Sequence, residues 1–174
     1  MLVSDNKLKW LVLSGVLLLG GILLLFSMRT QEKQRVALDL PTLGGERVQI
    51  PDPQGRLTWV NLWSASCAAC LQEMPDLETL HREQRSRLQV IAVAMPDDPP
   101  NMLVETQARL QLGLPIVLDL QGQAARQLAP ERIVPVHHLL DAQGRILYSV
   151  RGGLNHTEML AILTRHKPLD NALN

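Results

Sequence analysis

Apolar and polar positions along the chain form blocks that predict strands and helices in turn. Strands are expected where short runs of β-branched, aliphatic and aromatic residues lie between turn residues; these runs are residues 57–63, 88–95, 116–120, 136–140 and 145–150. Helices are expected where apolar residues recur every three or four positions; these segments are residues 67–85, 102–112, 123–128 and 157–165. Residues 38–50 predict a small hairpin around Gly44 and Gly45. This order of elements indicates an α/β fold.

Turn and capping residues indicate several boundaries of these elements. The cluster Asp141–Gly144 is typical of a tight turn between the last two strands. Gly113 is expected to cap the end of the second helix, and Asn155 or Thr157 to cap the start of the last one. Pro75 falls inside the first helix and is expected to kink it.

The N-terminal pattern differs from the rest of the chain. Residues 10–28 carry no charge over 19 positions, and at about 1.5 Å per residue they match the roughly 30 Å of a bilayer's hydrocarbon core. A secretory signal peptide has a shorter apolar core and a small-residue cleavage site, whereas residues 27–30 read Ser-Met-Arg-Thr. We therefore expect an uncleaved transmembrane anchor over residues 10–28, with a cleaved signal as the alternative.

The anchor divides the chain into segments. Residues 1–9 form a short flank, residues 29–37 a polar linker, residues 38–166 one α/β domain and residues 167–174 a tail. Three basic residues follow the apolar run and two precede it, which slightly favours the opposite orientation, although long domains can translocate regardless of charge. The cysteine chemistry described below is the main reason to expect the domain outside the cytoplasm.

Composition narrows the classes of function. Lys plus Arg and Asp plus Glu number 17 each, and no basic run stands out, so nothing favours nucleic acid as a partner. Two cysteines are too few for a disulfide scaffold. A bond between residues three positions apart closes a tiny loop and adds little stability. The pair is therefore expected to serve chemistry.

The segment Cys67-Ala-Ala-Cys70 directly follows a predicted strand and opens a predicted helix. Unpaired backbone N–H groups and the positive end of the helix dipole at that place favour the thiolate, which is the attacking form. Cys67 is then the exposed nucleophile, and Cys70 resolves the mixed disulfide. A zinc pair is one alternative, although zinc needs further ligands and the adjacent His137 and His138 point opposite ways on a strand. The other alternative is that both cysteines are buried and chemically inert.

Residues 59–75, Trp-Val-Asn-Leu-Trp-Ser-Ala-Ser-Cys-Ala-Ala-Cys-Leu-Gln-Glu-Met-Pro, resemble the active-site segment of thioredoxin-like proteins of the TlpA/ResA/DsbE type. The similarity continues at residues 112–119 and 133–146 and covers about residues 38–166. It implies a thioredoxin-like fold, with a central mixed sheet flanked by helices and an αβ insertion at residues 96–120. It also implies a membrane-anchored thiol–disulfide oxidoreductase that uses no cofactor beyond its cysteines.

The resemblance implies roles for four more residues. Pro135 takes the cis form beside the cysteines and Val134 offers its backbone to a bound substrate strand; the alternative is an ordinary strand-entry proline. Glu73 matches the family's acidic residue, and its i,i+3 spacing places it near Cys70, where a partly buried carboxylate would transfer the proton of thiol exchange. The alternative is a solvated helix glutamate. Trp63 is expected to pack near the site and contact substrate, or to serve the core alone.

The sequence departs from the family pattern around the cysteines. Ser66 replaces the usual tryptophan, Leu62 replaces a phenylalanine, and the spacer is Ala-Ala where relatives often carry a proline. His137 and His138 stand where small polar and aromatic residues are common; one of them would stabilise the thiolate, or the ring faces outward. Because such neighbours tune the reduction potential, the direction of electron flow stays open.

The resemblance favours a reductant of protein disulfides outside the cytoplasm, single-pass in the cell inner membrane with its domain on the periplasmic side. Its clients would be disulfide-bearing proteins, for example apocytochromes c at their haem-attachment cysteines, and a membrane electron donor of the DsbD/CcdA type would recharge it. One alternative is a copper-binding protein of this fold that uses Cys67, Cys70 and His137, since thiolates suit Cu(I). A weaker alternative is an interaction module on an inactive scaffold.

Overall fold

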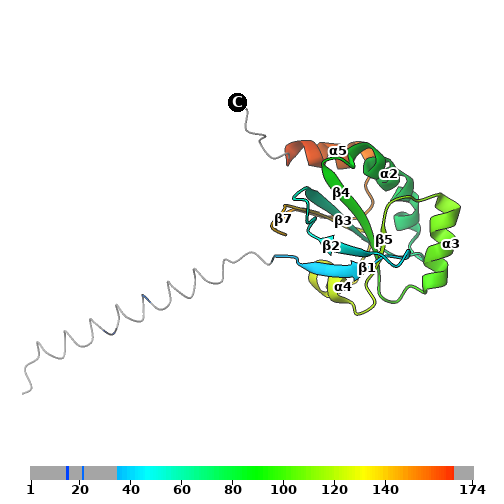
Figure 1. Ribbon diagram of the computed structural model, residues 1–174, viewed down its shortest axis with the longest axis horizontal. Helices are drawn as coiled ribbons and strands as arrows, with labels where there is room; N and C mark the ends of the chain where they lie inside the picture. Colours follow the sequence, from blue (N-terminus) through cyan, green and yellow to red (C-terminus); the bar gives the residue numbers. More distant parts are fainter. Residues whose placement is uncertain (1–14, 16–20, 22–34, 167–174) are drawn as a thin grey trace, which may run out of the picture. The chain divides into compact units, whose positions relative to one another are not determined.

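The structure, a computed structural model, describes residues 35–166 together with Gly15 and Gly21 (Figure 1). Apart from those two glycines, the predicted anchor at residues 10–28 lies outside the described residues. The flank 1–9 and the tail 167–174 lie outside them as well. No helix within the described part of the chain is long and apolar enough to cross a membrane.

A five-stranded mixed sheet, in the order β5-β4-β3-β6-β7, forms the centre of the domain. The strands are β3 (Leu57–Trp63), β4 (Leu88–Ala94), β5 (Ile116–Leu118), β6 (Val136–Leu140) and β7 (Ile146–Arg151). β3, β4 and β5 run parallel, whereas β6 pairs antiparallel with both β3 and β7. The inner strands are covered on both faces, which is why they read as continuous apolar runs in the sequence.

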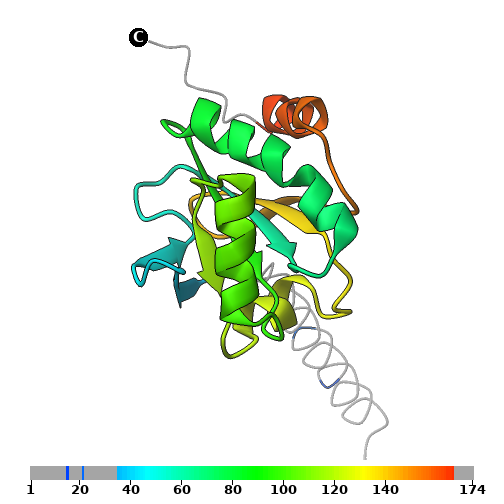
Figure 2. The same cartoon turned by 90° about the vertical axis from the view of Figure 1, so that its right-hand side faces the viewer.

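Different elements cover the two faces of the sheet. The helices α2 (Ala68–Gln84), α3 (Pro100–Leu110) and α5 (His156–Arg165) pack over one face, here called the α2 face. The short helix α4 (Gln123–Leu128) and an antiparallel hairpin of β1 (Leu38–Pro41) and β2 (Arg47–Ile50) cover the other, here called the α4 face. Figure 2 shows α2 and α3 crossing the near side of the sheet, with α4 below.

The predicted elements are all present; β3, α4 and β6 have the predicted bounds, and the others differ at one or both ends. The αβ insertion expected at residues 96–120 is formed by α3 and β5, and β5 stops two residues early because Asp119 opens a turn closed by the Gly122 N–H at 2.9 Å. The prediction that Gly113 caps α3 is wrong. Gln111 takes the left-handed conformation there, with φ of 54°, and the Gly113 N–H donates instead to Glu78 Oε2 at 2.8 Å.

Residues close in the sequence determine where α5 and α2, the two helices beside the cysteines, begin. Asn155 caps α5 as predicted: its side chain accepts from the Glu158 N–H at 3.0 Å, and Glu158 Oε2 accepts from the Asn155 N–H at 2.9 Å. α2 begins directly after Cys67 and is continuous through Pro75. The cysteines therefore lie just after the end of β3, at the start of the longest described helix.

Candidate active site

Cys67 and Cys70 form a disulfide at the N-terminus of α2. Cys67 is the N-cap residue, and its Sγ lies 3.1 Å from the backbone nitrogen of Cys70, whose N–H points at the sulfur. The Cys67 N–H itself donates to the Ser64 carbonyl at 3.1 Å, which closes the short turn between β3 and α2. When the bond is reduced, the free N–H groups of the first helical turn stabilise a thiolate at Cys67.

The two sulfurs differ in access. Cys70 is 0% exposed and belongs to the core on the α2 face. Cys67 is partly exposed, between the exposed residues Ser66 and Ala68. Thiol exchange needs one sulfur that a partner can reach and one that only the first sulfur can reach, and this pair has that asymmetry.

The peptide bond between Val134 and Pro135 is cis, which confirms the expectation from the family resemblance. Pro135 directly precedes β6, and its carbonyl accepts from the Gly152 N–H at 2.9 Å. The Val134 carbonyl oxygen lies 3.7 Å from Cys67 Sγ. The backbone of Val134 therefore flanks the accessible sulfur, where a substrate chain would have to approach.

A cavity of about 370 Å³ opens beside Cys67. Its apolar lining comes from Met95, Met102 and Val134, and Met102 is 37% exposed. An ion pair between Arg132 and Asp97 stands at the same cavity. The surface next to the nucleophile therefore combines apolar side chains with the Arg132–Asp97 ion pair and a second aspartate, Asp98.

Glu73 lies one turn after Cys70 on α2 and is 4% exposed, which excludes the alternative of a solvated helix glutamate. Its Oε1 accepts from Asn61 Nδ2 at 2.8 Å. Its Oε2 accepts from His137 Nε2 at 3.1 Å and from the Leu154 backbone N–H at 3.0 Å. Three hydrogen-bonding groups therefore converge on one buried carboxyl group and hold it in place.

His137 faces the α2 side of the sheet and is 1% exposed. Its Nδ1 lies 3.3 Å from Trp59 Nε1 and its Nε2 lies 3.1 Å from Glu73 Oε2. The ring is therefore neither outward-facing nor directed at the sulfurs, the two options that the sequence left open. It is part of the hydrogen-bond network of Glu73.

His138 faces the α4 side, as the alternation along a strand predicts, and it is 6% exposed. Its Nε2 lies 2.8 Å from the Leu128 carbonyl, and its Nδ1 lies 2.7 Å from Ser149 Oγ. Burial lowers the pKa of His138 below its ordinary value; the Leu128 hydrogen bond opposes this and the neighbouring His137 adds to it. The prediction of an outward-facing ring is wrong for this residue too.

The histidine positions give no support to the copper-binding alternative. Both ring nitrogens of His137 already have partners, and His138 lies on the opposite face from the cysteines. Among the residues that the structure describes, no group of three or more His, Cys, Asp or Glu side chains is arranged to hold a metal ion.

Trp63 ends β3 and is 0% exposed, in the same core as Cys70. Packing near the site is therefore confirmed, whereas contact with a substrate stays a prediction. Within the described range its indole Nε1 has no hydrogen-bond partner. Sequence reasoning missed Asn61 and Trp59, which complete the Glu73 network. The signal that could have revealed Asn61 is its polar side chain in the middle of an apolar strand.

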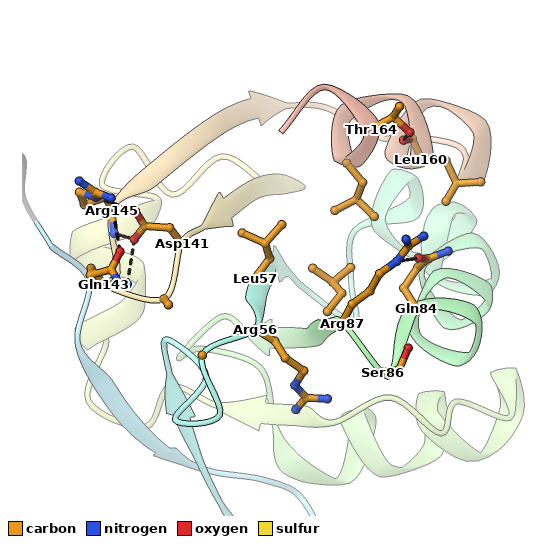
Figure 3. A pocket seen from close by; sticks show the side chains of 14 residues that line it. Arg56, Leu57, Gln84, Ser86, Arg87, Asp141, Gln143, Arg145, Leu160 and Thr164 are labelled. Carbon is orange, nitrogen blue, oxygen red and sulfur yellow. Dashed lines mark hydrogen bonds and ion pairs between the residues drawn. The ribbon is translucent and has the colours of Figure 1, made fainter. Parts of the chain in front are cut away.

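A cavity of about 550 Å³ opens at another place in the domain (Figure 3). It is lined by the first residue of β3, Leu57, the first residue of β4, Leu88, and side chains of α5. Cys67 follows the other end of β3. This cavity has arginines and leucines but no cysteine in its lining, so it is not the redox site.

Comparisons with known proteins agree with this geometry. The thioredoxin-like protein YneN of Bacillus subtilis is 28% identical over 165 residues, which cover 87% of this chain and 94% of YneN. The thiol–disulfide oxidoreductase ResA of Halalkalibacterium halodurans is 25% identical over 142 residues, 82% of this chain and 80% of ResA.

Solved structures show the same fold. The crystal structure of StoA from Bacillus subtilis matches with a TM-score of 0.66 at 20% identity and covers 73% of this chain and 96% of StoA. The described domain therefore has a thioredoxin-like α/β fold. Residues 32–149, more than half of the sequence, match one family description, and the chain belongs to the AhpC/TSA family.

Proposed function

We propose that this thiol–disulfide oxidoreductase reduces disulfide bonds in other proteins outside the cytoplasm. The observation that carries the proposal is the partly exposed Cys67 at the N-terminus of α2, paired with the fully buried Cys70 one turn later. Relatives named thiol–disulfide oxidoreductase support it.

The reaction proceeds in two exchanges. The Cys67 thiolate attacks a client disulfide, forms a mixed disulfide and releases one client sulfur, which takes a proton from water. Cys70 then gives up its proton and attacks Cys67 Sγ, which forms the Cys67–Cys70 bond and releases the second client sulfur. Two electrons have passed to the client, and Glu73 is the group placed to take the Cys70 proton.

The client docks across the cavity beside Cys67. Val134 offers backbone groups next to the sulfur, while Met102 and Ile133, 37% and 57% exposed, offer apolar contact. An extended segment with apolar residues beside its cysteine suits this surface, because its backbone and its side chains both find partners. Pro135 is buried directly after Val134, and Trp63 is buried at the end of the strand that leads to the cysteines, so both are proposed to support this surface.

The apolar N-terminal run and the cysteine chemistry together support a location at the membrane. We propose that residues 10–28 span the cell inner membrane once and that the domain faces the periplasm. A protein tethered there meets a membrane electron donor of the DsbD/CcdA type, and the periplasm has no soluble thiol buffer to replace it. Apocytochromes c are the proposed clients, as in the TlpA/ResA/DsbE type that the active-site segment resembles.

Trapping the mixed disulfide tests the reaction. The full-length Cys70→Ser variant, mixed with a peptide that carries an oxidised Cys-x-x-Cys-His segment, is expected to accumulate a covalent adduct at Cys67, detected by mass spectrometry. The matched Cys67→Ser variant is expected to give none, and the wild type to release reduced peptide. Equal adduct from both variants, or an unreduced peptide with the wild type, contradicts the proposal.

A further inference from the structure

We propose that His137 is a positioning residue of the exchange reaction: held in one tautomer by Trp59, it keeps Glu73 ready to accept the proton of Cys70. This inference rests on the proposed function, because it concerns the second exchange, in which Cys70 attacks. It concerns a residue at which this chain departs from the pattern of the proteins that it resembles.

The network joins three secondary elements inside the α2-face core. Glu73 comes from α2, Trp59 and Asn61 from β3 and His137 from β6, where His137 lies opposite Asn61 in the register. The side chains of Glu73 and His137 are 3% and 1% exposed. Trp59 and His137 also meet edge to face, with ring centroids 5.8 Å apart. Buried polar groups are costly unless they hydrogen-bond to one another. Within the described residues, Asn61 Oδ1 is the one side-chain atom of this network that lacks a partner.

The indole N–H fixes the tautomer of His137. An indole nitrogen donates and never accepts, so Nδ1 of His137, 3.3 Å from Trp59 Nε1, must accept and carries no proton. Asn61 Nδ2, 3.4 Å away, points a second donor toward the same nitrogen. The ring proton is therefore on Nε2, where it is donated to Glu73 Oε2 at 3.1 Å. A second ring proton, on Nδ1, would place two N–H donors against each other, His137 Nδ1 and Trp59 Nε1.

This arrangement has a consequence for Glu73. A neutral imidazole that can only donate stabilises the carboxylate without competing for the proton that the carboxylate receives. Glu73 follows Cys70 by three residues, a rise of about 4.5 Å along the buried side of α2. In the second exchange the Cys70 proton passes to Glu73, the Cys70 sulfur bonds to Cys67, and the client sulfur leaves with the bonding pair.

Few other titratable groups face Glu73. Asp76 of α2 and Glu158 of α5 line a cavity of about 370 Å³ that Glu73 also lines. Glu158 is committed to the capping box of α5. Both are acidic, so neither replaces the hydrogen bond that His137 supplies. The same cavity gives the accepted proton a route from Glu73 to solvent.

The test separates the two exchanges in the full-length protein. The substrate is a disulfide between a dye thiol that leaves first and a peptide thiol that leaves second, so that the first release reports attack by Cys67 and the second reports attack by Cys70. His137→Leu is expected to move the pH midpoint of the second release upward by about one to two pH units, the effect of one lost charge-assisted hydrogen bond. The first release is expected to keep its profile.

Two variants serve as controls. His137→Gln keeps an N–H near the position of Nε2 and is expected to restore most of the wild-type profile. His138→Gln, the same change on the opposite face, is expected to leave both releases unchanged. A His137→Leu profile that superimposes on the wild type overturns the inference, as does a loss that is equal at every pH. Absence of the first release in the wild type contradicts the proposed function instead.

Nitrogen NMR of the imidazole tests the tautomer without depending on the fold of any leucine variant. In the wild type, His137 is expected to carry its ring proton on Nε2. In Trp59→Phe, which lacks the indole N–H, the ring is expected to lose its preference for the Nε2 tautomer. A wild-type His137 protonated on both nitrogens, or on Nδ1 alone, overturns the inference.

Discussion

His137 and His138 are neighbours on one strand, and both are buried, yet they serve different parts of the molecule. His137 bonds to Glu73 on the helix that begins at the cysteines. His138 bonds to the Leu128 carbonyl of α4 and to Ser149 of the neighbouring strand β7. The face of the sheet, and not the residue type, decides which histidine is connected to the reaction.

The same contrast holds for the two cores. The α2 face carries Cys70, Trp63 and a connected polar network around Glu73. The α4 face is packed by aliphatic side chains of the sheet, the β1–β2 hairpin and α4. We infer that damage to the α4 face lowers stability alone, whereas damage to the α2 face also changes the exchange reaction.

The largest expected effect is a cavity on the α4 face. Ile91 of β4 is 0% exposed, so Ile91→Ala is expected to lower the free energy of unfolding by about 2–5 kcal/mol. Urea unfolding measures the loss, with Ile91→Val as the milder control. The exchange rate of the folded fraction is expected to stay at the wild-type value. A tenfold slower exchange in folded Ile91→Ala would break the division between the faces.

Removing the carboxylate from the α2 face is expected to slow exchange. Glu73→Gln keeps the size of the side chain but no longer accepts the Cys70 proton, so the second thiol release is expected to fall about 10²-fold, equivalent to roughly 2.7 kcal/mol. Single-turnover measurements with the two-part disulfide give this rate. A fall of less than about threefold would remove Glu73 from the reaction.

Substitution of His138, on the α4 face, is expected to lower stability without changing exchange, unlike substitution of His137. His138→Leu leaves the Leu128 carbonyl and the Ser149 hydroxyl without their partner, which is expected to lower stability by about 1–3 kcal/mol. Thermal or urea unfolding measures this loss, and exchange is expected to be unaffected. An altered pH profile of exchange in this variant would show that the two faces are coupled.

The smallest effect is a pH dependence of stability that belongs to His138. Because burial lowers its pKa below the ordinary 6.5, the unfolded chain binds the proton more readily than the folded one. Neutral His138 therefore makes its full contribution to the free energy of unfolding above pH 6.5. This contribution is lost as the pH falls from 6.5 toward the lowered pKa of His138 in the folded protein. Urea unfolding of the wild type and His138→Gln is therefore expected to show a stability difference that shrinks on acidification. A constant difference would contradict a lowered pKa.

The sequence predicted the strands, the helices and the cysteine pair because these depend on local patterns. The run Leu57–Trp63 and the helical spacing after Cys67 carry that information without reference to distant residues. The Gln111 cap was not predictable from local sequence, because glycine is the usual residue at that position and Gly113 lies two residues later. The Gly113 N–H instead donates to Glu78, which is 35 residues away in the chain.

The network around Glu73 could not be predicted either, because its members are distant in the sequence. Glu73 and His137 lie 64 residues apart, and Trp59 and His137 lie 78 apart. Alternation along β6 predicts that the two histidines face opposite ways but not which one meets α2. That choice depends on the register between β3 and β6, which only the folded sheet reveals.

The central claim is that Cys67 and Cys70 serve reduction of client disulfides, and the reduction potential of the full-length protein tests it most directly. Equilibration against dithiothreitol and glutathione buffers, with the oxidised fraction read by mass spectrometry, gives the value. A potential near that of thioredoxin, about −270 mV or a little higher, is the expected result. A potential near about −120 mV, typical of strong oxidants, would contradict the account and make the protein a disulfide donor.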